Sequence, residues 1–544
     1  MLRNRGWLAA VILCCSGAAS SAEDAATVLA QCRNALDAFP RESIALKIEK
    51  KDGAWRATEL SVALAHITDR DMQSVTRLDT LESIELHGPT GELTGAVDGA
   101  ALARLGAFPH LRRLSLCVAL PESGSKTIGN LTELEELVII THLGEAIDVD
   151  RLKGLQKLRR LWLYCNGMND SALHSLRALI HLEELQVGGT EITDAGLAEL
   201  SNLASLRRLE CGMTLVTRQG IESLKNLPRL EYLECDVAAD FSLLRGLRSL
   251  SIVLLRSDDD GAVKTLLPEN LETLSAELLD AQRLVSGRPL RRLRSLDLYR
   301  GSAYNPLDLK WLPALPELRE LEIGCEVDGV AEALVGLKSL RVLSLWNVKD
   351  RVGDDDMKAL AELRGLESLS ISGGGPFFTD AGMKALGTLA QLQRLTLRGT
   401  GAVTDQGFAP LGRLTRLRSL TLCVGDRLTK PRVDKAFRPA DALLDHVQAC
   451  SELEELALQS GHITDHGLAK LAALKKLRSL NLMSCRGFSD AALASLIDAL
   501  PNLRIVSLHY GSAEKPVPSP PVRTLRHKTV SDAMANVTAG RGTP

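Results

Sequence analysis

Large aromatic side chains recur at fixed places in a repeated leucine pattern, L-x-x-L-x-L. Six of the ten Trp and Tyr residues occupy the third, fifth, seventh or eighth position of a copy: Trp162, Tyr164, Tyr232, Tyr299, Trp346 and Tyr510. These positions alternate with the leucines, so in a strand the rings face away from them. Trp and Tyr dominate the energetics of protein interfaces, which predicts a contact surface. Lateral packing between strands is the other interpretation, above all for Trp162 beside Tyr164.

Acidic residues share these outward positions between the aromatics. They are Glu210, Glu234, Asp236, Glu277, Asp297, Glu320 and Glu322. A surface that combines rings with carboxylates favours a basic or polar partner. The predicted partner-binding residues are Trp162, Tyr164, Tyr232, Glu234, Asp236, Asp297, Tyr299, Glu322, Trp346 and Tyr510.

No group of residues predicts catalysis. The sequence lacks G-x-S-x-G, P-loop, H-E-x-x-H and dinucleotide-binding glycine patterns. His462 and His466 have the spacing of metal ligands on one helical face, but they flank an expected helix start and are better explained as variable surface residues. The same holds for His446 and Cys450. We therefore predict no enzyme activity, no catalytic residue, no metal site and no cofactor.

The leucine pattern supplies the elements that position these residues. Its copies begin at Leu81, Leu111, Leu134, Leu158, Leu182, Leu206, Leu230, Leu247, Leu271, Leu293, Leu318, Leu340, Leu366, Leu392, Leu417, Leu453, Leu477 and Leu503. A degenerate copy at Leu60 and Val62 precedes them. The spacing is roughly 25 residues, which is typical of a repeat array. Alternation within each copy predicts a short, half-buried strand.

A helical period follows each strand, and its start has a recurrent signature. In ITDAGLAEL, Thr193 stands where a helix N-cap is needed, and Asp194 suits the positive end of the helix dipole. Equivalent pairs are Thr68-Asp69, Asn169-Asp170, Thr379-Asp380, Thr404-Asp405, Thr464-Asp465 and Ser489-Asp490. Metal binding by these acids is the alternative, but capping explains both residues.

This alternation of strand and helix resembles the leucine-rich-repeat family, over residues 57–511. The resemblance implies an α/β solenoid, or horseshoe, with a parallel β-sheet on the concave face and helices on the convex face. The Thr/Ser-Asp helix start, with Cys485 and Cys450 at turn positions, is similar to the cysteine-containing subclass of F-box-type and ribonuclease-inhibitor-like repeats, which includes exported bacterial proteins. Many repeats here carry Thr or Gly where that subclass has Cys.

Four segments are expected along the chain. Residues 1–22 resemble a secretory signal peptide, with Arg3 and Arg5 before an apolar stretch and a cleavage site near Ala22. Residues 23–56 are expected to cap a solenoid of about 19 repeats that spans 57–511. The Pro-rich segment 512–544 is expected to be disordered. These features predict export to the periplasm or outside the cell, and a lipid anchor at Cys15 fits the preceding residues poorly.

Charge alternates in the pair of residues after the first leucine of six successive repeats. The pairs are Arg112-Arg113, Glu135-Glu136, Arg159-Arg160, Glu183-Glu184 and Arg207-Arg208, and Glu231 follows alone. Opposite charges on neighbouring parallel strands attract, so we expect this row to fix the register of the strands. We interpret this row as a feature that stabilises the fold rather than as a binding site.

Composition limits the function. The net charge of −3 argues against nucleic-acid binding, which needs a basic surplus. Outside the signal there is no apolar run long enough to span a membrane. The sequence therefore predicts a non-catalytic exported scaffold that binds a protein on its concave face. The alternatives are a ubiquitin-ligase-type substrate receptor, although 23–56 shows no F-box, and a carbohydrate- or cell-surface-binding structural protein.

Overall fold

The structure is a computed structural model, and it describes most of the repeat region. The described residues are 11–14, 31–32, 35–36, 44–51, 54–88, 95–141, 146–165, 167–188, 191–212, 214–237, 239–252, 266–277, 290–299, 309, 311–324, 334, 336–346, 352–372, 378–398, 400, 402–423, 441–459, 462–483, 485 and 487–509. They form two compact units, one up to Leu247 and one from Arg248 onward. The segment 512–544 and Tyr510 lie outside the described residues.

The expected strands are confirmed in every copy of the leucine pattern. Each strand begins two residues after the first leucine, as in β9 (Arg160–Tyr164) after Leu158. The leucines fill the core: Leu158, Leu161 and Leu163 are fully buried, while Trp162 and Tyr164 on the alternate face are half-exposed. We call the side of the sheet opposite the leucines the strand face.

In the first unit, neighbouring strands follow the chain order. These strands are β1 (Val11–Cys14), β2 (Ile44–Lys51), β3 (Ala54–Ala63), β5 (Ser83–His87), β7 (Arg113–Cys117), β8 (Glu136–Ile140), β9, β10 (Glu184–Gly188), β11 (Arg208–Glu210) and β12 (Tyr232–Cys235). All neighbours are parallel except β2 and β3, which are antiparallel. β4 (His66–Ile67) and β6 (Ala96–Val97) form a small second sheet.

The second unit repeats this arrangement with parallel neighbours throughout. Its strands are β13 (Ser249–Ile252), β14 (Thr273–Glu277), β15 (Ser295–Tyr299), β16 (Glu320–Gly324), β17 (Val342–Trp346), β18 (Ser368–Ser372), β19 (Arg394–Leu397), β20 (Ser419–Cys423), β21 (Glu455–Gln459), β22 (Ser479–Met483) and β23 (Ile505–His509).

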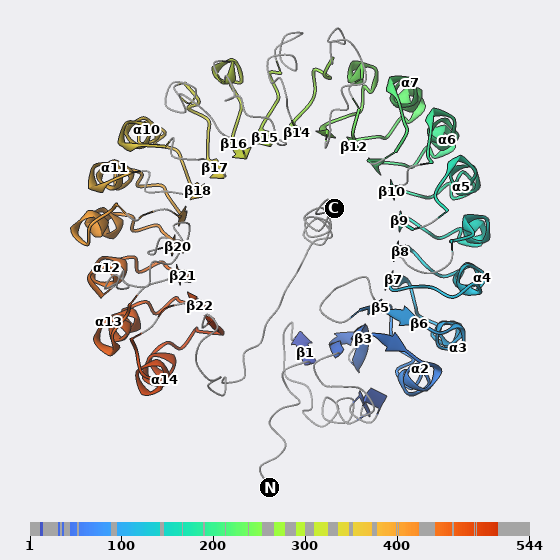
Figure 1. Ribbon diagram of the computed structural model, residues 1–544, viewed down its shortest axis with the longest axis horizontal. Helices are drawn as coiled ribbons and strands as arrows, with labels where there is room; N and C mark the ends of the chain where they lie inside the picture. The colour runs from blue at the N-terminus through green and yellow to red at the C-terminus, as the bar shows by residue number, and fades with distance from the viewer. Residues whose placement is uncertain are drawn as a thin grey trace, which may run out of the picture. The chain divides into compact units, whose positions relative to one another are not determined.

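Short helices cover the leucine side of each sheet (Figure 1). The first unit has α2 (Asp69–Val75), α3 (Gly99–Ala103), η4 (Arg104–Ala107), α4 (Gly124–Gly129), η5 (Val149–Gly154), α5 (Asp170–Leu176), α6 (Asp194–Glu199), η6 (Leu200–Asn202), α7 (Arg218–Ser223), η7 (Leu224–Asn226) and η8 (Phe241–Leu243). The second has η9 (Leu312–Ala314), α10 (Asp354–Leu360), α11 (Asp380–Leu386), η10 (Gln406–Arg413), α12 (Asp441–Val447), α13 (Asp465–Lys470), η11 (Leu471–Ala473) and α14 (Asp490–Ala499). The described part of the chain has no helix that is long and apolar enough to cross a membrane.

A capping hydrogen bond is present at all seven of the predicted pairs. Thr68, Asn169, Thr193, Thr379, Thr464 and Ser489 each accept a hydrogen bond from a backbone N–H of the helix that follows. Thr404 accepts from the N–H of Gly407 at 3.3 Å, but the helix that follows it is the 3₁₀-helix η10, which Asp405 precedes directly. That helix contains Pro410, which cannot donate the backbone hydrogen bond that an α-helix would need.

The acidic residue after the cap does more than the sequence predicts. Asp170 accepts hydrogen bonds from the backbone N–H and the hydroxyl of Thr193 in the next repeat, at 2.7 and 2.6 Å. Asp194, Asp354, Asp380, Asp441 and Asp465 bind the next N-cap in the same way. Each of these carboxylates therefore joins one helix to the next.

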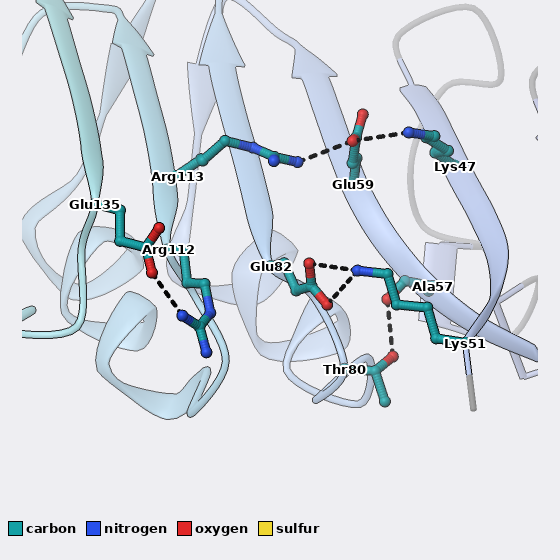
Figure 2. A network of polar contacts seen from close by, with 9 residues as sticks. All are labelled: Lys47, Lys51, Ala57, Glu59, Thr80, Glu82, Arg112, Arg113 and Glu135. Carbon is teal, nitrogen blue, oxygen red and sulfur yellow. Dashed lines mark hydrogen bonds and ion pairs between the residues drawn. The ribbon is translucent and has the colours of Figure 1, made fainter. Parts of the chain in front are cut away.

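The N-terminal hairpin β2–β3 is tied to the first repeats by ion pairs (Figure 2). Lys51 contacts Glu82 at 2.7 Å, and Glu59 accepts from both Lys47 and Arg113 at 3.0 and 2.9 Å. Lys51 and Glu82 extend the alternating row of charges by two residues. The expected pairs within that row are present for Arg112–Glu135, Arg159–Glu183 and Arg207–Glu231.

Irregular repeats have distinct local structures. The step from Leu230 to Leu247 is too short for an α-helix, and only the 3₁₀ turn η8 forms there. The insertion after Leu417 ends in α12, whose Asp441 joins the carboxylate series although no Thr or Ser precedes it. Cys450 and Cys485 are buried, and their thiols donate to carbonyls of an earlier repeat.

Candidate partner-binding surface

On the strand face of the first unit, Tyr164 lies over the neighbouring strand. A side chain added at Gly188 would meet the Tyr164 ring at 2.5 Å, so the ring occupies the space that Gly188 leaves open. Gln186 Nε2 donates to the Tyr164 hydroxyl at 3.0 Å. Burial raises the pKa of this phenol, which therefore stays neutral at physiological pH. Tyr164 is fixed in place, and the half-exposed Trp162 lies on the same face of β9.

A second cluster on this face surrounds Arg208. Its guanidinium carbon lies 3.5 Å from the centroid of the Tyr232 ring, which is a cation–π contact. Arg208 Nε also donates to Glu210 at 2.8 Å, and the Tyr232 hydroxyl donates to Glu234 at 3.0 Å. Burial first, and then the carboxylate of Glu234, raise the pKa of Tyr232. The positive charge of Arg208 is therefore paired within the cluster, by Glu210 and the Tyr232 ring.

Two acids of the first unit are less accessible than the sequence indicates. Asp236 is only 2% exposed, because β12 ends at Cys235 and the alternation of faces ends with it. Glu210 is buried beneath Arg208. The accessible candidates of this unit are therefore Trp162, Tyr164, Tyr232 and Glu234.

In the second unit, Trp346 at the end of β17 lies across β16. A side chain at Gly324 would overlap the indole ring, so the ring lies directly on this glycine. Burial raises the pKa of the neighbouring Glu322, and the indole of Trp346 partly opposes this shift. Even so, 38% of Trp346 is exposed, which is high for a large apolar side chain. One face of the ring is held by β16 and the rest is open to solvent.

Glu322 has a second acid beside it, on β15. Asp297 and Glu322 are direct register partners. Ser275 donates to Asp297 Oδ2 at 2.9 Å, and Oδ1 has no hydrogen-bond partner among the described residues. Burial raises the pKa of Asp297, while partial burial and then repulsion by Asp297 raise the pKa of Glu322. The structure thus brings Asp297, Glu322 and Trp346 together.

Two predicted residues are not described at the level of their side chains. Tyr299 belongs to β15 and pairs in register with Gly324, but its side chain lies outside the described residues, as does that of Glu277. Tyr510 lies outside them altogether.

Sequence reasoning missed the glycines that position the aromatics. Gly188 and Gly324 each occupy the seventh position of a repeat whose neighbour carries an aromatic residue at the same position. That pairing is visible in the sequence once the repeats are aligned. Arg208, Gln186 and Ser275 were also missed, because their roles depend on side chains from adjacent strands.

One repeat of the chain matches a known family model. The family model described as Leucine Rich repeat matches residues 178–201, which span the end of one repeat, β10 and α6. Those residues share their leucine positions and strand with the other repeats of both units, and their capped helix with several of them. The described residues therefore have a leucine-rich-repeat fold. No curated protein matches it.

Several solved structures are similar at low identity. An internalin of Listeria monocytogenes is 18% identical, covering 85% of this chain and 95% of its own, with a TM-score of 0.27. A leucine-rich-repeat protein of Leptospira interrogans is 16% identical, covering 80% and 92%, with a TM-score of 0.33. A plant peptide hormone receptor, RGFR1 in complex with RGF2, is 14% identical, covering 85% and 82%, with a TM-score of 0.31. These values are too low to relate the chain to any of the three in function.

Proposed function

We propose that this leucine-rich-repeat protein is a non-catalytic scaffold that binds a protein partner on its strand face. The observation that carries the proposal is Trp346, a large ring that lies directly on Gly324 yet remains 38% exposed. Rigid aromatic anchors of this kind lose little conformational entropy on binding, and they are enriched among the residues that dominate interface energies. Trp162 supplies a second half-exposed ring in the first unit.

Catalysis has no support among the described residues. Several polar side chains of the strand face are engaged with one another, as in the pairs Arg208–Glu210 and Ser275–Asp297. No described group of three or more His, Cys, Asp and Glu residues has an arrangement suited to holding a metal ion. Binding therefore accounts for this surface better than group transfer does.

Export is the second part of the proposal. Arg3 and Arg5 before WLAAVILCC, followed by small residues up to Ala22, support a cleaved signal peptide. The buried thiols of Cys450 and Cys485 at turns support the cysteine-containing subclass of repeats. Mass spectrometry of the N-terminus in each cell fraction tests export, and a full-length chain found only in the cytosol would contradict it.

Partner capture tests the binding function. Mature wild-type chain is cross-linked to material from its own source, and captured proteins are compared with those of Trp346→Ala and Trp162→Ala. We expect one protein to be captured by the wild type and lost with at least one variant. Ile180→Ala and Leu215→Ala are matched controls, because both remove exposed apolar side chains away from the strand face.

The melting temperature separates contact from packing. An aromatic variant that melts like the wild type and loses the partner supports a contact surface. Equal capture by all four variants would contradict the proposal. Retention of glycans by the wild type, with loss in the Trp variants, would instead favour carbohydrate binding.

A further inference from the structure

The second unit contains an aromatic and acidic cluster that no cation among the described residues pairs with. Asp297, Glu322 and Trp346 lie on three successive strands, β15, β16 and β17. No basic side chain among the described residues forms an ion pair with either carboxylate. The two acids face each other in register, so their charges repel.

The first unit shows what completes a cluster of this composition. There, Arg208 lies between the Tyr232 ring, 3.5 Å away, and the Glu210 carboxylate. Arg208 occupies the residue two before Glu210 on β11. On β16, the residue two before Glu322 is Glu320, so an acid stands where the first unit has its arginine.

The surroundings on the strand face carry the same sign of charge. Within the strands from β13 to β18, the third, fifth and seventh positions hold Glu277, Asp297, Glu320 and Glu322 and no Lys or Arg, while Arg300, at the eighth position after Leu293, lies outside the described residues. Most of the others are Ser or Thr, such as Ser275 on β14, Ser344 on β17 and Ser370 on β18. The surface around Trp346 therefore consists of short polar side chains and carboxylates, and the indole ring is exposed above them. The negative charge of this surface is complementary to a basic segment of a partner.

We propose that Trp346 and Glu322 bind an arginine side chain of the protein partner, with Asp297 adding negative charge. The guanidinium would stack on the exposed indole and pair with the Glu322 carboxylate, as Arg208 does within the chain. Arginine fits better than lysine because its planar group combines stacking with directed hydrogen bonds. The inference rests on the proposed binding function and specifies the chemistry of its partner.

Fluorine NMR of the full chain tests this site directly. The five Trp residues are labelled as 5-fluorotryptophan, and the Trp346 resonance is assigned by its loss in Trp346→Phe. The probes are capped Gly-Gly-Arg-Gly-Gly, the same peptide with citrulline, which is nearly isosteric and uncharged, and the same peptide with lysine. We expect the Trp346 resonance to shift saturably with the arginine peptide, with weaker binding for lysine and none for citrulline.

Variants identify the carboxylate. Glu322→Gln should lower the affinity for the arginine peptide roughly three- to tenfold, which is the range for losing one partly exposed charge partner. Glu320→Gln is the matched control, since it neutralises an exposed acid two residues away on the same strand, and it should leave the affinity unchanged. Both substitutions are on the surface, so folding is retained and can be checked in the same spectra.

Several outcomes would overturn the arginine site. One is an equal shift with the citrulline peptide, and another is equal weakening by Glu322→Gln and Glu320→Gln. A shift with an oligosaccharide but not with the arginine peptide would also overturn it. These results leave the capture experiment untouched: partner loss in Trp346→Ala without arginine binding would keep the scaffold function and remove only this site.

Discussion

The carboxylate of Asp170 receives both the backbone N–H and the hydroxyl of Thr193, at 2.7 and 2.6 Å, although Thr193 belongs to the next repeat. Thr193 is at the same time the N-cap of α6. The helix cap and the contact between repeats are therefore one continuous hydrogen-bonded chain. Its recurrence in both units makes it a principal polar link on the helix side.

Replacing Asp170 with Ala should destabilise the protein by about 1–3 kcal/mol, because two hydrogen bonds to a charged group are lost. The measurement is the urea midpoint of unfolding. Asp490→Ala is the control, since Asp490 also lies in the first turn of its helix, α14, but no described cap of a following repeat binds it. Equal losses for the two variants would mean that only the helix dipole matters, as the sequence alone suggests.

Gly196 lies two residues after Asp194, and it faces Asp170 of the preceding repeat. A side chain at Gly196 would overlap the Oδ1 atom of Asp170. Gly196→Ala should therefore destabilise the protein, although Ala is favoured over Gly by about 1 kcal/mol inside helices. In an Asp170→Ala background the loss should be smaller, because only the contact with the backbone Cα of residue 170, at 3.0 Å, remains. Gly106→Ala, which meets nothing within 4 Å, serves as the control. Additive effects of the two substitutions would contradict the contact.

The row of alternating charges predicts an effect that depends on salt. Arg159 pairs with Glu183 and follows Glu135 in the row. Arg159→Glu would place three acids side by side, and we expect a loss of about 1 kcal/mol at low ionic strength that shrinks in about 1 M NaCl. Arg159→Gln removes the attraction without adding repulsion, so its loss should be smaller. The test is urea unfolding at both salt concentrations, and identical salt responses for the two variants would show that the row does not act electrostatically.

Sequence analysis predicts the strands well because their cause is local. Leu161 and Leu163 alternate with polar or aromatic residues, and burying the leucines fixes which face each neighbour takes. The N-cap role of Thr193 is equally local. The target of Asp170 was missed because it lies in another repeat, and hydrogen bonding between repeats leaves no signal within one of them.

The candidate surface was predicted in part. Trp346 and Glu322 are on the expected face, but the glycine beneath the ring matters as much as the ring itself. Asp236 is buried because its strand ends one residue earlier, a boundary that alternation cannot reveal. Arg208 forms its cation–π contact only because β12 places Tyr232 beside it, which depends on geometry between strands.

Neutralising Asp297 should stabilise the protein, with a definite dependence on pH. Burial raises the pKa of Asp297 above its ordinary value of 3.8, which means that the folded state disfavours the charged form. The stability contributed by the protonated group is thus fully present below the ordinary pKa of 3.8 and is lost as the pH rises through the raised pKa.

An asparagine side chain at this position would resemble the protonated acid, and Ser275 could still donate to its carbonyl oxygen. Asp297→Asn should therefore melt higher than the wild type near neutral pH and equally in acid below the ordinary pKa, measured by calorimetry. Glu320→Gln, on the same face but exposed, controls for the general loss of negative charge. A variant that melts lower than the wild type near neutral pH would show instead that the Asp297 charge is stabilised in the fold.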